Sequence, residues 1–168
     1  MSADLTYKWY AVYTKPRHEK KLALELSKKG ITNYCPLITT VKQWSDRKKK
    51  VEEALFKSYI FVNVSEEEYY KAINTTGAVK YVSFGGKASP VPDEQIEAVK
   101  KILEHRIDFT LSSESFEIGQ QVEVAYGALQ GIRGEIVSYS GKNYLLLRIE
   151  NIGYSLLVKV PASELKSV

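Results

Sequence analysis

The sequence is poor in the residues that most often build metal centres and catalytic sites. It holds a single cysteine, Cys35, and two histidines, His18 and His105, among 168 residues. One cysteine excludes an internal disulfide, and with two scattered histidines it does not make a Cys/His zinc site. Neither histidine belongs to a recognisable relay of carboxylate and nucleophile. We therefore expect no metal, no cofactor and no enzymatic activity.

Long apolar runs are also missing. No stretch approaches the roughly 18 apolar residues of a membrane-spanning helix, and the opening residues Met-Ser-Ala-Asp do not resemble a signal peptide. We expect a cytoplasmic protein with no membrane partner. Positive and negative charges are unevenly distributed: residues 1–106 hold 19 Lys and Arg against 13 Asp and Glu, whereas residues 107–168 hold 5 against 7. This asymmetry favours two units, of which the first tolerates polyanions.

The most apolar long run, 55–64, predicts a central strand because it is rich in β-branched and aromatic residues. Ile60 and Val62 fall on one alternate face, and Tyr59 and Phe61 on the other. If the aliphatic face packs on the core, the aromatic face, with Phe56 beside it, points outward and suits a protein partner. From composition alone, burial of both faces under helices is an equal alternative.

The segments around this run predict a ferredoxin-like βαββαβ pattern followed by one extra helix. The sheet of such a domain has helices on one face only, which favours the open aromatic face. The polar segment 42–50 joins the second and third strands and carries four consecutive cations, Arg47 to Lys50. At a hairpin tip these cations would attract phosphate; a solvated turn is the equal alternative. We expect strands near 7–13, 33–41, 55–64 and 78–84, and helices near 17–29, 65–76 and 93–103.

The character of the sequence changes after residue 106. Residues 108–115 lack periodicity and are typical of a linker. Beyond them, short runs of alternating apolar residues separated by glycines predict a small β-barrel. The predicted domains are therefore 1–106 and 117–168, joined by a linker at 107–116.

Several motifs, in order along the chain, resemble NusG-type transcription elongation factors. The segments 9–13, 34–36, 55–62, 85–86 and 90–92 resemble the N-terminal (NGN) domain of that family, and 119–137 resembles its KOW motif. The forms at 34–36 and 55–62 are most similar to specialised paralogues, namely the RfaH group and the UpxY-type antiterminators of capsular polysaccharide operons. The implied fold is α+β: a ferredoxin-like domain with an extra helix, linked to an SH3-like KOW barrel.

The resemblance implies a transcription elongation and antitermination factor that suppresses pausing and premature termination on selected operons, such as those for surface polysaccharides. It would dock on the clamp helices of the largest subunit of RNA polymerase. The implied polymerase-binding residues are Tyr10, Phe56, Tyr59, Phe61 and Phe84. Non-template DNA or nascent RNA would lie beside a basic side made of Lys15, Arg17, His18, Lys20, Lys21, Arg47, Lys48, Lys49 and Lys50.

One position departs from the family pattern, and two other functions stay open. Lys57 stands where the family usually has proline, which puts the local docking geometry in question. A KOW barrel could instead serve as an RNA- or ribosome-binding module, although residues 107–168 are net negative. The chain could also be a general NusG that assists Rho-dependent termination. The family further suggests a monomer and a small-subunit ribosomal protein as a partner of the barrel, which we expect to be a barrel and not a helical hairpin.

Overall fold

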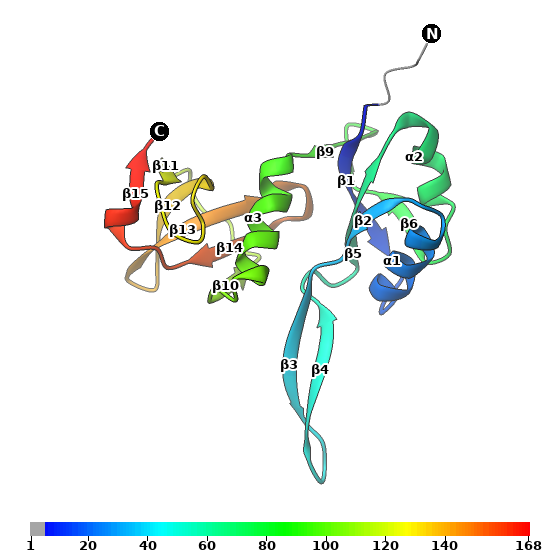
Figure 1. Ribbon diagram of the computed structural model, residues 1–168, viewed down its shortest axis with the longest axis horizontal. Coiled ribbons are helices and arrows are strands. Elements are labelled where there is room, and N and C mark those ends of the chain that lie inside the picture. The colour runs from blue at the N-terminus through cyan, green and yellow to red at the C-terminus, as the bar shows by residue number, and fades with distance from the viewer. Residues whose placement is uncertain (1–5) are drawn as a thin grey trace. The chain divides into compact units, whose positions relative to one another are not determined.

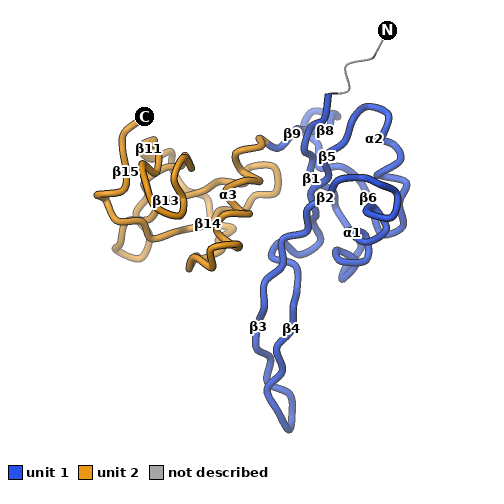
Figure 2. Tube along the Cα trace, in the orientation of Figure 1, with its two compact units in different colours: residues 1–91 blue, residues 92–168 orange. Residues whose placement is uncertain are grey.

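The computed structural model describes residues 6–168, and the chain divides into two compact units, 1–91 and 92–168 (Figure 2). The first unit contains an antiparallel sheet with strand order β2-β5-β1-β6, and β9 also pairs with β1 (Figure 1). This order is that of the predicted ferredoxin-like pattern. Its elements are β1 (Lys8–Thr14), α1 (Glu19–Lys28), β2 (Thr32–Tyr34), β3 (Leu37–Gln43), β4 (Lys48–Ala54), β5 (Tyr59–Val64), α2 (Glu66–Ile73), β6 (Ala78–Tyr81), β7 (Ser83–Phe84), β8 (Lys87–Ala88) and β9 (Pro90–Val91).

Helices α1 and α2 supply the core of this unit from one side of the sheet. Leu22 and Leu26 share a face of α1 and are buried together with Ile60 and Val62 of β5. Helix α2 begins at a capping box, in which the Ser65 hydroxyl accepts from the Glu68 N–H and the Glu68 carboxylate accepts from the Ser65 N–H. The aliphatic face of the predicted central strand is therefore the core face.

Strands β3 and β4 form a two-stranded hairpin of their own, separate from the main sheet (Figure 1). We expected one continuous strand at 33–41, but it breaks between Tyr34 and Leu37. Pro36 lies at the break and has no N–H for a sheet ladder. We also expected the four cations at the tip; the strands in fact extend to Gln43 and from Lys48, so that only Arg47 belongs to the tip at 44–47.

The second unit is a six-stranded antiparallel sheet with order β10-β14-β13-β12-β11-β15, which forms the predicted small barrel, together with helix α3. Helix α3 packs near β13, and Lys101 Nζ donates to the Gln130 carbonyl at 3.1 Å. The elements are α3 (Asp93–Glu104), β10 (Phe109–Ser112), β11 (Gln120–Val124), β12 (Arg133–Tyr139), β13 (Lys142–Ile149), η1 (Glu150–Ile152), β14 (Tyr154–Val158), η2 (Ala162–Glu164) and β15 (Leu165–Ser167).

Two features differ from the sequence expectation at the junction. Helix α3 falls in the second compact unit, whereas the boundary at 106 would assign it to the first. Within the predicted linker, residues 109–112 form strand β10, which pairs with β14 so that Leu111 lies opposite Leu156. Four residues are too few for alternation to reveal a strand. The division into an NGN and a KOW domain at the predicted boundaries stays a prediction. None of the helices in residues 6–168 combines the length and apolar character needed to cross a membrane.

Candidate functional site

The sheet of the first unit has an aromatic face opposite its helices. The register pairs Tyr13 with Tyr59 and Ala11 with Phe61, so that these side chains share one face. The Tyr13 and Tyr59 rings lie 4.9 Å apart, and Phe56 meets Phe61 edge-on at 5.9 Å. The predicted alternation of β5 is therefore correct. Sequence reasoning missed Tyr13, although its position follows from the same alternation once the pairing of β1 with β5 is known.

The predicted polymerase-binding residues do not form one exposed patch. Phe56 and Phe61 lie on the aromatic face but are 0% exposed, contrary to the open patch we expected. Tyr59 is half-buried. Phe84 is 61% exposed and sits at the short β7–β8 turn. On this face, the Tyr13–Tyr59 pair is therefore partly accessible, whereas Phe56 and Phe61 are fully buried.

Tyr10 lies on the opposite face of the sheet from the one we expected. It pairs with Val62 of the core face, and its ring meets Tyr69 and Tyr81 edge-on at 5.8 and 5.6 Å. Tyr81 stacks on Tyr69 at 4.1 Å and donates its hydroxyl proton to the Tyr69 carbonyl. Burial, reinforced by the neighbouring Tyr69, raises the pKa of Tyr81. Tyr10 therefore belongs to a tyrosine cluster under α2 and not to the aromatic face.

The turn before β5 explains how the chain accommodates Lys57. The Tyr59 N–H donates to the Phe56 carbonyl at 3.2 Å, and Ser58 has a φ of +66°. A positive φ at the third residue is typical of a type II turn, in which the second position is compatible with proline. Lys57 occupies that second position. The turn is secured by Glu19, a buried carboxylate at the start of α1 that accepts the Ser58 N–H at 3.0 Å.

A groove of about 790 Å³ runs between the start of α1 and the β3–β4 hairpin. Of the nine predicted nucleic-acid residues, the groove brings together Arg17, Lys20 and Lys21. It also includes Lys42 and Lys57, which sequence reasoning missed. The remaining predicted residues lie outside the groove lining: Lys15, His18, Arg47, Lys48, Lys49 and Lys50.

The carboxylates of this groove are engaged with other groups. Glu52 lies 4.0 Å from Lys20, and Glu53 lies 3.4 Å from Lys42 while accepting the Thr40 hydroxyl at 3.2 Å. The hydroxyl of Thr40, and then the ammonium of Lys42, hold the pKa of Glu53 below its ordinary value. The groove lining holds more cations than carboxylates, so its net charge is positive. The cations are Arg17, Lys20, Lys21, Lys42 and Lys57, and the carboxylates are Glu19, Glu52 and Glu53.

The remaining polar groups give no sign of a reactive site. Burial, followed by the charge of Glu19, raises the pKa of Cys35 to about 11, so its thiol stays protonated at neutral pH. Within residues 6–168, no three His, Cys, Asp or Glu side chains gather as metal ligands would. In the second unit, the Arg148 guanidinium donates to Glu135 and to the Phe116 carbonyl at 2.6 and 2.8 Å. Those contacts fasten the segment before β11 to the barrel.

A ferredoxin-like sheet with an aromatic face and a basic groove, followed by a small barrel, defines an α+β protein of two units. The model of the family described as "Transcription termination factor nusG" matches residues 7–100. Since this match spans more than half of the chain, the chain belongs to the NusG family.

Relatives of this chain carry the same description. The "Transcription termination/antitermination protein NusG" of Staphylococcus epidermidis is 25% identical over 179 residues, and the alignment covers 96% of each chain. The Staphylococcus carnosus protein matches equally, at 25% identity and 96% coverage of both chains. A solved structure described as "Domain interaction in Thermotoga maritima NusG" is 20% identical, covers 97% of this chain and 98% of that one, and superposes with a TM-score of 0.49.

Proposed function

We propose that this chain is a specialised antitermination factor that binds RNA polymerase through the aromatic face of its first unit. The half-buried Tyr13–Tyr59 pair carries this proposal, because aromatic rings on an otherwise packed face are the usual hot spots of protein interfaces. The family resemblance supplies the partner surface, the clamp helices of the largest polymerase subunit. Phe84, exposed at the β7–β8 turn, would border the interface.

The basic groove would lie beside nucleic acid of the elongation complex. Arg17, Lys20 and Lys21 are brought together there by the first turns of α1, and phosphates are the natural counterions of such a cluster. Polymerase would exist in an open-clamp state and a closed-clamp state that resists pausing. The factor would shift the equilibrium between these states only by as much as its affinity for the two differs. The resemblance to specialised paralogues extends the proposal to selected operons, and the resemblance to the family extends it to a monomeric state. The sequence features described above add a cytoplasmic location.

The test is binding to a bacterial RNA polymerase with and without its clamp helices. The Tyr13→Ala/Tyr59→Ala double variant should lose at least tenfold in affinity, whereas Tyr126→Ala, an exposed tyrosine of the second unit, should bind like wild type. Phe61→Ala is a poor probe of binding, because Phe61 is fully buried and its truncation would destabilise the whole unit. Wild-type binding that survives deletion of the clamp helices would contradict the proposal.

Two outcomes would point to the other functions. Binding of naked RNA by residues 92–168, without polymerase binding, would favour an RNA- or ribosome-binding module. Capture of Rho by the barrel would favour a general NusG. The surplus of acidic over basic residues in 107–168 weighs against the first of these.

A further inference from the structure

Trp44 is a large aromatic side chain placed where it contributes nothing to a core. Trp44 is the first residue of the tip of the β3–β4 hairpin, and its backbone N–H donates to the Arg47 carbonyl at 2.7 Å. Its side chain is 44% exposed, and all residues from 41 to 50 are exposed. An exposed indole at a polar tip gains little from burial, so its position calls for another explanation.

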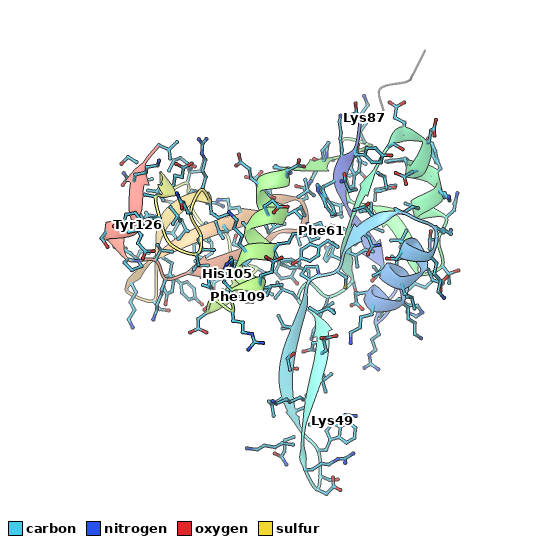
Figure 3. The ribbon with its side chains drawn as sticks, viewed as in Figure 1. Lys49, Phe61, Lys87, His105, Phe109 and Tyr126 are labelled. Carbon is cyan, nitrogen blue, oxygen red and sulfur yellow. The ribbon has the colours of Figure 1, made fainter. Side chains whose placement is uncertain are left out.

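Two cations lie over this ring from within the hairpin. The Lys49 ammonium is 4.5 Å and the Arg47 guanidinium 5.5 Å from the ring centroid. In the hairpin register, Lys49 lies opposite Lys42. These contacts hold the indole in place and surround it with positive charge. Figure 3 labels Lys49 near the end of the projecting hairpin.

The positive charge at the tip is not neutralised internally. Among residues 6–168, no carboxylate lies within ion-pair distance of Arg47, Lys48, Lys49 or Lys50. Of the three acidic residues of the hairpin, Asp46 lies at the tip, where the four cations at 47–50 outnumber it. Glu52 and Glu53 lie nearer the base, where Lys20 and Lys42 accompany them. The hairpin therefore carries free cations at its outer end, beside an exposed ring.

The ring also borders the basic groove. Trp44 and Lys42 line it from the hairpin, Lys20 and Lys21 line it from α1, and Arg17 lines it from the turn just before α1. A chain of phosphates that follows the α1 cations would thus reach the indole. A stacking ring combined with a cationic track is the recurrent arrangement for unpaired nucleic-acid strands, since every base has a π-face and every nucleotide a phosphate.

We propose that Trp44 stacks on an unpaired base of a strand that lies in this groove and continues past the hairpin tip. Arg17, Lys20 and Lys21 would hold its phosphates within the groove, and Arg47 and Lys48 to Lys50 those beyond the indole. The inference rests on the proposed function, which places the basic side of the first unit beside nucleic acid, and it identifies the ligand as an unpaired strand and not a duplex. Non-template DNA and nascent RNA both supply such a strand.

The chain contains two tryptophans, which makes stacking directly observable. Trp9 is buried at 8% exposure, whereas Trp44 is exposed. In a Trp9→Phe variant, titration with a single strand of about 12 nucleotides should quench the fluorescence of Trp44 in a saturable manner. In the reciprocal Trp44→Phe variant, in which Trp9 is the only tryptophan, the emission should not change. Circular dichroism of both variants verifies that they fold.

A second measurement separates stacking from charge. Trp44→Ala should weaken single-strand binding roughly 5- to 100-fold and leave the salt dependence of the affinity unchanged, because no charge is lost. Lys48→Gln should instead reduce the slope of log affinity against log salt by about 0.7. Single-stranded DNA and RNA of the same sequence are titrated side by side, and the tighter of the two identifies the source of the strand.

The proposal is overturned if Trp44 emission does not respond to a bound strand, if Trp44→Ala binds within twofold of wild type, or if a duplex binds and quenches as well as a single strand. Polymerase binding is measured on the same Trp44→Ala protein and should be retained. A wild-type chain that ignores polymerase but quenches with single strands would defeat the proposed function and leave this inference standing.

Discussion

The first unit contains two kinds of antiparallel pairing that differ in what supports them. Strands β1 and β5 bury more than half of their residues, among them Val12, Ile60 and Val62, which are at most 2% exposed. Strands β3 and β4 are as long as β1, yet only Ala54, at the base of the hairpin, is buried. An isolated two-stranded hairpin is marginally stable in water. The sheet therefore supplies the stability of the unit. The outer hairpin contributes little to it, so its side chains remain available for contact with a partner.

The sheet and the hairpin should differ most in how much stability is lost when an aromatic side chain is truncated to alanine. Phe61→Ala removes a fully buried ring from the sheet and should lower the free energy of unfolding by about 3–5 kcal/mol. Trp44→Ala removes an exposed ring of similar size and should change it by less than about 1 kcal/mol. Urea unfolding followed by circular dichroism compares them, and equal losses would mean that the hairpin is part of the cooperative core.

The contrast between buried and exposed side chains extends to a carboxylate of the second unit, Glu135. Although burial opposes it, the hydrogen bonds from Arg148 and from the Gly119 N–H hold the pKa of Glu135 below its ordinary value. Glu135→Gln should destabilise the chain by about 2–3 kcal/mol, somewhat less than in fully buried pairs, because the Arg148 side chain keeps 23% exposure.

The sign of the pH dependence follows from the direction of that pKa shift. A carboxyl group with a lowered folded-state pKa stabilises the fold fully above its unfolded pKa of about 4.3 and loses this contribution as the pH falls through the folded-state pKa. The melting temperature of the wild type should therefore fall as the pH is lowered below about 4.3. Glu135→Gln should flatten this part of the curve, and an unchanged curve would contradict the assignment.

A smaller loss of stability is expected when the hydrogen bond between α1 and the turn before β5 is removed. Glu19→Ala leaves the Ser58 N–H without its acceptor and should cost about 1–2 kcal/mol of unfolding free energy. Glu25→Ala is the matched control on the same helix, because Glu25 forms only an exposed pair with Lys28 at 3.2 Å and should cost under about 0.5 kcal/mol. Chemical denaturation of both variants measures the difference, which should vanish if Glu19 is dispensable.

The smallest effect concerns the turn between the hairpin and β5. Ser58 adopts a φ of +66° that glycine tolerates more readily. We expect Ser58→Gly to change stability by no more than about 1 kcal/mol, in the stabilising direction. Lys57→Pro restores the residue usual in the family at a position that favours proline, and should stabilise by about 0.4–1 kcal/mol. Differential scanning calorimetry resolves such shifts, and a lower melting temperature for Lys57→Pro would argue against the type II turn.

Local patterns in the sequence were sufficient for the order of elements and for the two faces of β5. They were not sufficient for the side on which Tyr10 lies, because that depends on the register between β1 and β5, a pairing of residues about fifty positions apart. The sequence also did not decide whether Phe56 and Phe61 are buried, because alternation shows on which face a side chain lies but not whether other residues cover that face. Strand β10 was missed because its alternation is too short to stand out against a linker.

The basic groove was predicted in part for a related reason. Consecutive cations at 47–50 drew attention to the tip. The cations that line the groove come instead from three segments that only the fold brings together, namely Arg17 to Lys21, Lys42 and Lys57. A tryptophan three residues before a run of four cations was a visible signal for Trp44. Its significance depended on knowing that the tip stays exposed.

The exposed tip of the hairpin has a consequence for handling the protein. A protease that cuts after lysine or arginine finds four consecutive sites at 47–50, in a stretch that is exposed throughout and has little packing to resist local opening. One cut there would open the first unit only at the outer end of its hairpin, where no buried residue lies, and would separate the ends of β3 and β4. We expect the nicked protein to keep its melting temperature. If the proposals above hold, it would also keep its affinity for polymerase and bind single strands more weakly.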